Sequence, residues 1–288
     1  MLTKNGFIYK IYTDFLDKQE MEKVEYIKAI IKNRKLIFQL GKNDFRNKFA
    51  NTSLGAIWGF LQPFVYMVTY AIVLQYILKT GSSGDDPFIV WYLPAMAIWQ
   101  FLNDSVLNIT NSIRNYSYLV KKVLFPVDVI PTISLISTCI TSLFVIIVAT
   151  IICIIYGYMP NVLLMIYYIF AALCFIVGFT RLTSAISTLV PDFAQLLSIL
   201  MQILFWFTPI IWDISFVSGL AGGKIEILVK CMPFSYVITG FRQAFVGGNI
   251  LTESYGIYTI IFWVITIGVF IWSNHIFKKC KKDFADVL

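Results

Sequence analysis

Six long apolar runs limit what this chain can fold into. They cover residues 57–79, 88–110, 129–156, 162–190, 194–216 and 255–276 of the 288-residue sequence. A helix needs about 20 apolar residues to cross about 30 Å of hydrocarbon, and it satisfies its own backbone hydrogen bonds there. The pattern predicts an all-α integral membrane protein, with six transmembrane helices in residues 54–288 and a cytoplasmic N-terminal segment over residues 1–53.

The composition supports a membrane protein. Charged residues make up only 14% of the chain and hydrophobic residues 58%, whereas a soluble domain carries about a quarter charged residues. The net charge of +7 is concentrated in the polar segments, so we attribute it to membrane orientation and expect no nucleic-acid partner. The charged N-terminal region predicts no cleavable signal peptide.

The positive charges fall mainly on one side of this six-span frame. Of the 23 Lys and Arg residues, eleven lie in residues 1–48, three in residues 111–128, one at Arg181 and four in residues 278–282. The opposite side holds four, which are Lys79, Lys224, Lys230 and Arg242. Because the more positive side of a membrane protein faces the cytoplasm, both termini are predicted to be cytoplasmic.

Two further segments have helical features without the length of a span. Residues 225–250 hold apolar pieces of about 10–14 residues, split by Pro233 and Gly240, which indicates re-entrant outer helices between spans five and six. Residues 20–40 carry apolar residues at helical spacing between lysines. This pattern predicts an amphipathic helix at the inner interface, attracted to acidic membrane lipids; packing on a partner protein is the alternative.

The sequence has no recognisable catalytic or metal-binding set. It contains one histidine, His275, and five scattered cysteines without a CxxC pair. Ile225 follows Gly223-Lys224 where a phosphate-binding loop needs Ser or Thr. We therefore expect no enzyme activity and no cofactor in this chain, and we expect another subunit to supply energy for any uphill transport.

Two spans carry a face of polar and aromatic residues. On the first span this face holds Trp58, Gln62, Tyr66 and Tyr70, and on the fifth it holds Gln195, Ser198, Gln202 and Phe205. Pro209 is expected to kink the outer end of the fifth span. Amide side chains lose hydrogen bonds in lipid, so these faces should meet protein or water.

The sequence leaves two interpretations of these faces open. Flat aromatic rings beside amides suit sugars, which present apolar C–H faces and hydroxyl edges. Helix packing combined with the interfacial aromatic belt explains the same residues, and the belt is favoured for Trp58. Asp104, beside Asn103, is interpreted as a hydrogen-bonded contact within the second span.

Four motifs in order resemble one transporter family. They are "DFRNKFANTSLGAIWGFLQP" (44–63), Lys122 with Phe125-Pro126 and Pro131, "FWFTPIIW" (205–212) and "MPFSYVITGFRQAFVGG" (232–248). The chain resembles the type-2 ABC permeases that export teichoic acid, O-antigen and capsule polysaccharides. It departs from them at Pro191-Asp192, where Arg-Asp is common, and at Met232-Pro233, where Asn-Pro is common. The first departure removes the basis for a salt bridge at position 191.

The resemblance implies a second copy of this chain and a separate ABC ATPase subunit that holds ATP and Mg. It also implies a cytoplasmic coupling helix over about residues 114–126, lying in a groove of the ATPase. Its apolar contacts would be Tyr116, Leu119, Val120 and Phe125, with Lys121 and Lys122 at the edge and Pro126 at its end. A loop held on the lipid surface by its lysines is the alternative.

The expected function is export of a lipid-linked cell-envelope polysaccharide across the bacterial plasma membrane. The polymer would pass the two polar and aromatic faces, and Arg181 would guide its anionic headgroup. The alternatives are a type-2 permease for small drugs or lipids and an ATP-independent channel. A membrane-embedded transferase lacks its acid and base residues.

Overall fold

The computed structural model describes residues 26, 30–77, 87–120, 126–247 and 253–288, and these ranges are helical without any strand. The longer helices are α2 (Arg34–Lys48), α3 (Trp58–Ile72), α4 (Phe88–Thr110), α7 (Ile130–Ile155), α8 (Val162–Leu189), α9 (Asp192–Phe207), α11 (Pro233–Val246) and α12 (Glu253–Lys281). The short ones are α5 (Ser112–Asn115), α6 (Ser117–Val120), α10 (Lys224–Cys231) and α13 (Phe284–Val287). The all-α prediction is confirmed.

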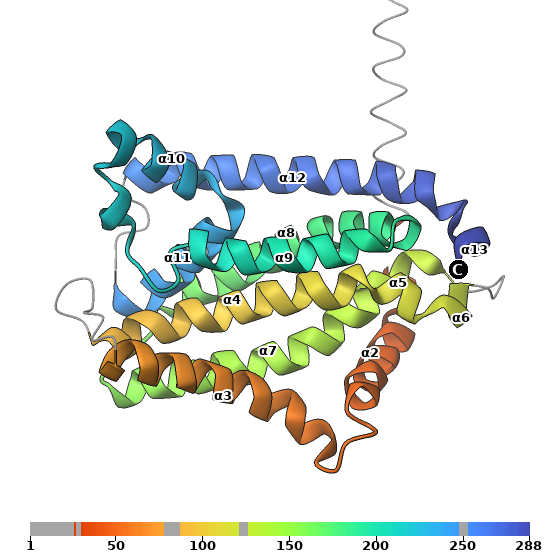
Figure 1. Cartoon of the computed structure of the whole chain (residues 1–288), viewed down its shortest axis with the longest axis horizontal. Coiled ribbons are helices and arrows are strands. Elements are labelled where there is room, and N and C mark those ends of the chain that lie inside the picture. The colour runs from red at the N-terminus through yellow and green to blue at the C-terminus, as the bar shows by residue number, and fades with distance from the viewer. Residues whose placement is uncertain (1–25, 27–29, 78–86, 121–125, 248–252) are drawn as a thin grey trace, which may run out of the picture.

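The long helices form a bundle with two distinct ends (Figure 1). In that view α4 lies between the pair α8 and α9 and the pair α3 and α7. One end of the bundle carries α5, α6, α13 and the C-terminus, and the other end carries α10.

Four helical segments are long and apolar enough to cross a membrane: Gly55–Ile77, Val127–Ile155, Val162–Leu189 and Gly256–Lys281. These segments make the chain a membrane protein. Helix α4 has the length of a span but carries polar residues, and 18 of its 23 residues are buried against its neighbours. Three of its polar residues, Asn103, Asp104 and Asn108, are only partly buried.

Most predicted boundaries agree with the structure, and two differ. Helix α9 ends at Phe207, whereas the fifth run was predicted to continue, kinked, to residue 216. Pro209 has no N–H to donate and pushes the residue before it into an extended conformation. Residues 20–25 and 27–29 of the predicted amphipathic helix lie outside the described residues, and α2 continues to Lys48, beyond the predicted end at residue 40. Gly41 lies within α2 where it packs on α7: a Cβ there would lie 2.7 Å from Ile136.

The segment between α9 and α12 also differs from its prediction at one glycine. Pro233 separates α10 from α11, as expected. Gly240, which was predicted to split the apolar stretch, instead lies inside α11, where a Cβ would fall 2.0 Å from the ring of Tyr168 on α8. The absence of a side chain at Gly240 therefore lets α11 pack closely against α8.

Hydrogen bonds between aromatic residues reinforce this approach. The Tyr236 hydroxyl of α11 lies 3.0 Å from the Tyr167 hydroxyl of α8 and 3.0 Å from the Thr259 hydroxyl of α12. Trp263 of α12 donates its indole N–H to the Tyr167 hydroxyl at 3.0 Å. Helix α11 is thereby joined to both α8 and α12.

Replacing Gly240 should separate these helices. Gly240→Ala places a methyl group on the Tyr168 ring, and we expect a loss of about 1–3 kcal/mol of stability from overpacking. The matched control is Gly268→Ala on α12, where a Cβ meets no atom within 4 Å. Thermal unfolding of both variants in detergent checks this; equal melting temperatures for the two would contradict the account of Gly240.

Candidate functional site

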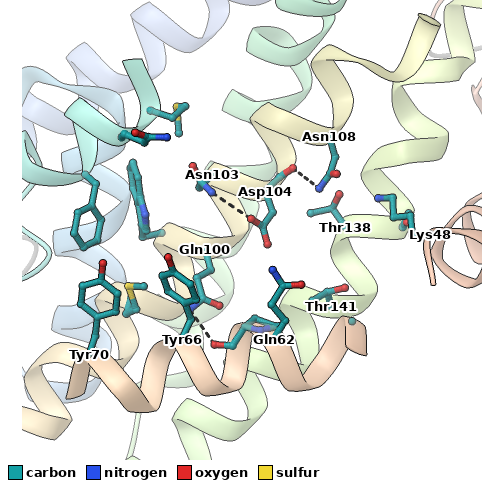
Figure 2. Close-up of a pocket in the computed structure, with 18 of the residues that line it drawn as sticks. Lys48, Gln62, Tyr66, Tyr70, Gln100, Asn103, Asp104, Asn108, Thr138 and Thr141 are labelled. Atoms are coloured by element: carbon teal, nitrogen blue, oxygen red, sulfur yellow. Dashed lines mark hydrogen bonds between the residues drawn. The ribbon is translucent and has the colours of Figure 1, made fainter. Parts of the chain in front are cut away.

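A cavity of about 630 Å³ opens between α3, α4, α7 and α9, next to the end of α2 (Figure 2). The predicted faces of the first and fifth spans meet at this cavity. Its lining includes Gln62, Tyr66 and Tyr70 from α3 and Gln202 and Phe205 from α9. The other predicted residues, Trp58 on α3 and Gln195 and Ser198 on α9, are not part of its lining.

Aromatic rings form one part of the cavity wall. Tyr66 and Tyr70 are stacked with centroids 5.6 Å apart, and Tyr70 meets Phe205 edge-on at 5.9 Å. Trp99 of α4 lies 5.7 Å from Phe205, and Trp206 lies 5.5 Å from it. The rings therefore connect α3, α9 and α4 in one continuous contact.

Polar side chains of α4 form another part of the wall, and Asp104 and Gln62 point into the cavity from α4 and α3 (Figure 2). Asn103 donates its amide N–H to Asp104 Oδ1 at 3.2 Å, and Asn108 donates to the Asp104 backbone oxygen at 2.8 Å. Gln100 donates to the Pro63 carbonyl oxygen of α3 at 3.2 Å.

Sequence reasoning missed this second polar face. It treated Asp104 as an isolated contact, although Gln100, Asp104 and Asn108 recur every four residues and so share one side of a helix. Hydroxyl groups of α7 complete this wall, with Ser137, Thr138 and Thr141 among the lining residues.

The predicted coupling segment is two short helices, α5 and α6, that meet at Tyr116. Its predicted outward contacts Tyr116, Leu119 and Val120 are buried within the chain itself, in a cluster that includes Ile37 of α2 and Phe277 of α12. The expectation that these three side chains are exposed is therefore wrong. Among the described residues of this segment, the exposed aromatic residue is Tyr118, at 56%.

Sequence reasoning assigned Tyr118 no role. Helical spacing alone predicts that Tyr118 and Leu119 point in different directions, but it does not indicate which one meets the bundle. Lys121, Lys122 and Phe125 lie outside the described residues. Pro126 immediately precedes a short 3₁₀ turn, Val127–Val129, and Pro131 occupies the first turn of α7.

A chain of polar contacts runs from this segment to the cavity. The Tyr116 hydroxyl donates to Asp44 Oδ1 at 2.6 Å. Burial and this hydrogen bond to a carboxylate raise the pKa of Tyr116. Asp44 Oδ2 lies 3.4 Å from the ammonium of Lys48, and Lys48 lines the cavity. Two residues of α2 therefore connect Tyr116 to the lining of the cavity.

Arg181 is buried rather than exposed to a headgroup. Its side chain forms an ion pair with Asp128 at 3.0 Å, and its guanidinium carbon lies 4.0 Å from the Tyr26 ring and 4.1 Å from the Phe277 ring. Lys281 of α12 pairs with the same carboxylate. These contacts tie α8 and α12 to the residues just before α7, and they contradict the surface position that headgroup guidance requires.

Comparison with known proteins identifies the family. A family model described as ABC-2 type transporter matches residues 35–246, which is well over half of the chain and includes the whole cavity. The chain belongs to the ABC-2 type transporter family.

Individual relatives in this family are distant but match along most of their length. The chain is 21% identical over 260 residues to an O-antigen export system permease protein RfbA of Klebsiella pneumoniae, covering 88% of this chain and 95% of the relative. It is 20% identical over 271 residues to the O-antigen export system permease protein RfbA of Myxococcus xanthus, covering 91% and 99%.

Proposed function

We propose that this chain is the membrane permease subunit of an ATP-driven exporter that moves a lipid-linked cell-envelope polysaccharide out of the bacterial cytoplasm. The observation that carries the proposal is the cavity, whose wall holds amide, carboxyl and hydroxyl groups in one part and aromatic rings in another. Sugars have the same two kinds of surface, since their hydroxyl edges form hydrogen bonds and their C–H faces lie on aromatic rings. Similarity to permeases named for O-antigen export supports the proposal.

In the proposed topology α3, α4, α7, α8, α9 and α12 cross the plasma membrane, and α10 and α11 form the re-entrant outer element. Two features of the structure support it. Helix α2 and the basic end of α12 lie in the same half of the bundle as the C-terminus, whereas α10 lies at the other end (Figure 1). The positive-inside rule makes the first end cytoplasmic.

The proposed exporter contains two copies of this chain. The cavity lies partly open to the side, and neighbouring α3 and α9 expose apolar side chains such as Val65, Ile199 and Ile203. Apposition of α3 and α9 from a second copy would enclose a path between the two chains, with the lipid anchor left in the bilayer.

The proposed partner is an ABC ATPase that holds ATP and Mg and meets α5 and α6. Tyr118 is the exposed aromatic anchor in this segment, and exposed aromatic residues carry much of the binding energy at protein interfaces. The Tyr116–Asp44–Lys48 contacts give its movement a route to the cavity. An export permease for small apolar compounds is the second candidate, but it does not explain the polar wall on α4.

The proposed ATPase contact predicts different effects for substitutions at two neighbouring residues, Tyr118 and Leu119. Tyr118→Ala should reduce co-purification of the cognate ATPase without changing the melting temperature, because the side chain is exposed and stabilises little within the chain. Leu119→Asp should lower the melting temperature, since it buries a charge without a partner. Full recovery of the ATPase with Tyr118→Ala would contradict this assignment.

Export itself tests the cavity. We expect Gln62→Leu and Gln202→Leu each to slow glycan export by about 2–10-fold, the loss of one hydrogen bond, with assembly unchanged. The matched control is Gln195→Leu, the same substitution on α9 at a position outside the lining. The measurement is surface glycan per unit time in cells that depend on this permease; equal export by all three variants would remove the cavity from the path.

A further inference from the structure

The cavity offers no surplus of positive charge. Among the described residues that line it, the carboxylate is Asp104 and the ammonium is Lys48. The charge of Lys48 is already offset by Asp44, whose Oδ2 lies 3.4 Å from the ammonium. Asp104 has the amide of Asn103 as its neutral hydrogen-bond donor. A ligand in the cavity therefore meets a carboxylate with a neutral hydrogen-bond donor and an ammonium that Asp44 already offsets.

Two further lining groups are buried and lack a partner. Gln100 is 9% exposed, and donation of its Nε2 to the Pro63 carbonyl fixes which atom of the amide is the oxygen. That oxygen, Oε1, accepts no hydrogen bond from the described residues, and the Ser137 hydroxyl, on a residue that is 1% exposed, also has no partner among them. Buried polar groups in native proteins normally have partners. Both residues line the cavity, but these two atoms are themselves closed off from it, so a ligand can bond to them only when neighbouring side chains move aside.

The hydrogen-bond partners that these side chains lack indicate the chemical class of the ligand. An amide oxygen and a carboxylate accept hydrogen bonds and do not donate them. They need a donor, and a sugar hydroxyl provides one while also accepting from Ser137 or Asn103. An ionised phosphate diester has no proton to give, so it would leave Gln100 Oε1 without a partner. It would also meet Asp104 as a like charge, at a site where low dielectric strengthens repulsion.

We infer that the cavity selects an uncharged, hydroxyl-rich glycan and disfavours chains that carry phosphate in every repeat. The inference rests on the export function proposed above and narrows its substrate class. Asp104 and Gln100 are its specificity-determining residues: they accept hydrogen bonds from sugar hydroxyls, while the rings of Tyr66, Trp99 and Phe205 lie against the C–H faces. A phosphate-bearing polymer would call for bidentate Arg or clustered Lys, which the described lining does not contain.

The test compares two soluble probes of equal length on the full chain, purified in detergent with its cognate ATPase. One probe is maltoheptaose, which is neutral, and the other is a glycerol-phosphate heptamer, which is anionic. Binding is measured by isothermal titration calorimetry. We expect the wild type to bind maltoheptaose at least about tenfold more tightly than the anionic probe.

Asp104→Asn keeps the shape of the side chain and removes its charge. It should reduce the preference for maltoheptaose by about tenfold, through weaker neutral binding and stronger anionic binding. The matched control is Asp192→Asn, which removes an exposed carboxylate on α9 outside the cavity and should leave both affinities unchanged. Ser137→Ala, which removes a hydroxyl without a partner in the described chain, provides a second variant with little cost to folding and should weaken maltoheptaose binding.

Each other outcome overturns a specific statement. Equal or tighter binding of the anionic probe to the wild type would overturn the neutral-glycan inference and leave glycan export standing. An unchanged preference in a folded Asp104→Asn, or unchanged maltoheptaose binding by Ser137→Ala if the first variant fails to fold, would overturn the residue assignments. Binding of neither probe would overturn both the inference and the role of the cavity in export.

Discussion

A polar helix inside a membrane must be surrounded by protein or face water, and in the proposed topology helix α4 imposes this requirement on the rest of the bundle. Its amide and carboxyl groups would each lose hydrogen bonds in hydrocarbon. Helices α7, α8 and α11 pack around it, and the remaining polar side faces the cavity. The close approach at Gly240 and the tyrosine hydrogen bonds of α11 are parts of that enclosure. The proposed path thus lies along the polar side of α4, which its helical neighbours leave uncovered.

The end of the bundle that carries α5, α6 and the C-terminus has a different construction. The predicted coupling segment is tied into the chain by the buried side chains of Tyr116 and Leu119 rather than projecting from it. Nearby, Arg181 and Asp128 hold α8 to the residues that precede α7. In the proposed exporter an ATPase that presses on Tyr118 would therefore move this whole end of the bundle. That movement would reach the cavity through Asp44 and Lys48.

Much of this organisation could be predicted from the sequence, because apolar runs and four-residue spacing report directly on helices in lipid. The run at residues 88–110 matches α4, and the recurrence of Gln62, Tyr66 and Tyr70 indicated one face of the first span, whose three residues line the cavity together with Gln202. What failed depends on tertiary contacts. Spacing does not show that Leu119 points inward, and the burial of Arg181 depends on Asp128, 53 residues earlier in the chain. The role of Gly240 depends on Tyr168, which the local sequence does not contain.

The central claim is that a glycan passes through this cavity, and site-specific photocrosslinking tests it most directly. A photoreactive phenylalanine analogue replaces Tyr66, which lines the cavity, or Ile151, an exposed apolar residue of α7 outside it. Cells that export the native glycan are irradiated, and the permease is probed for attached polysaccharide. The account predicts a glycan adduct at position 66 and none at position 151, with the adduct lost when the partner ATPase is inactivated. Absence of an adduct at position 66, or equal adducts at both positions, would contradict it.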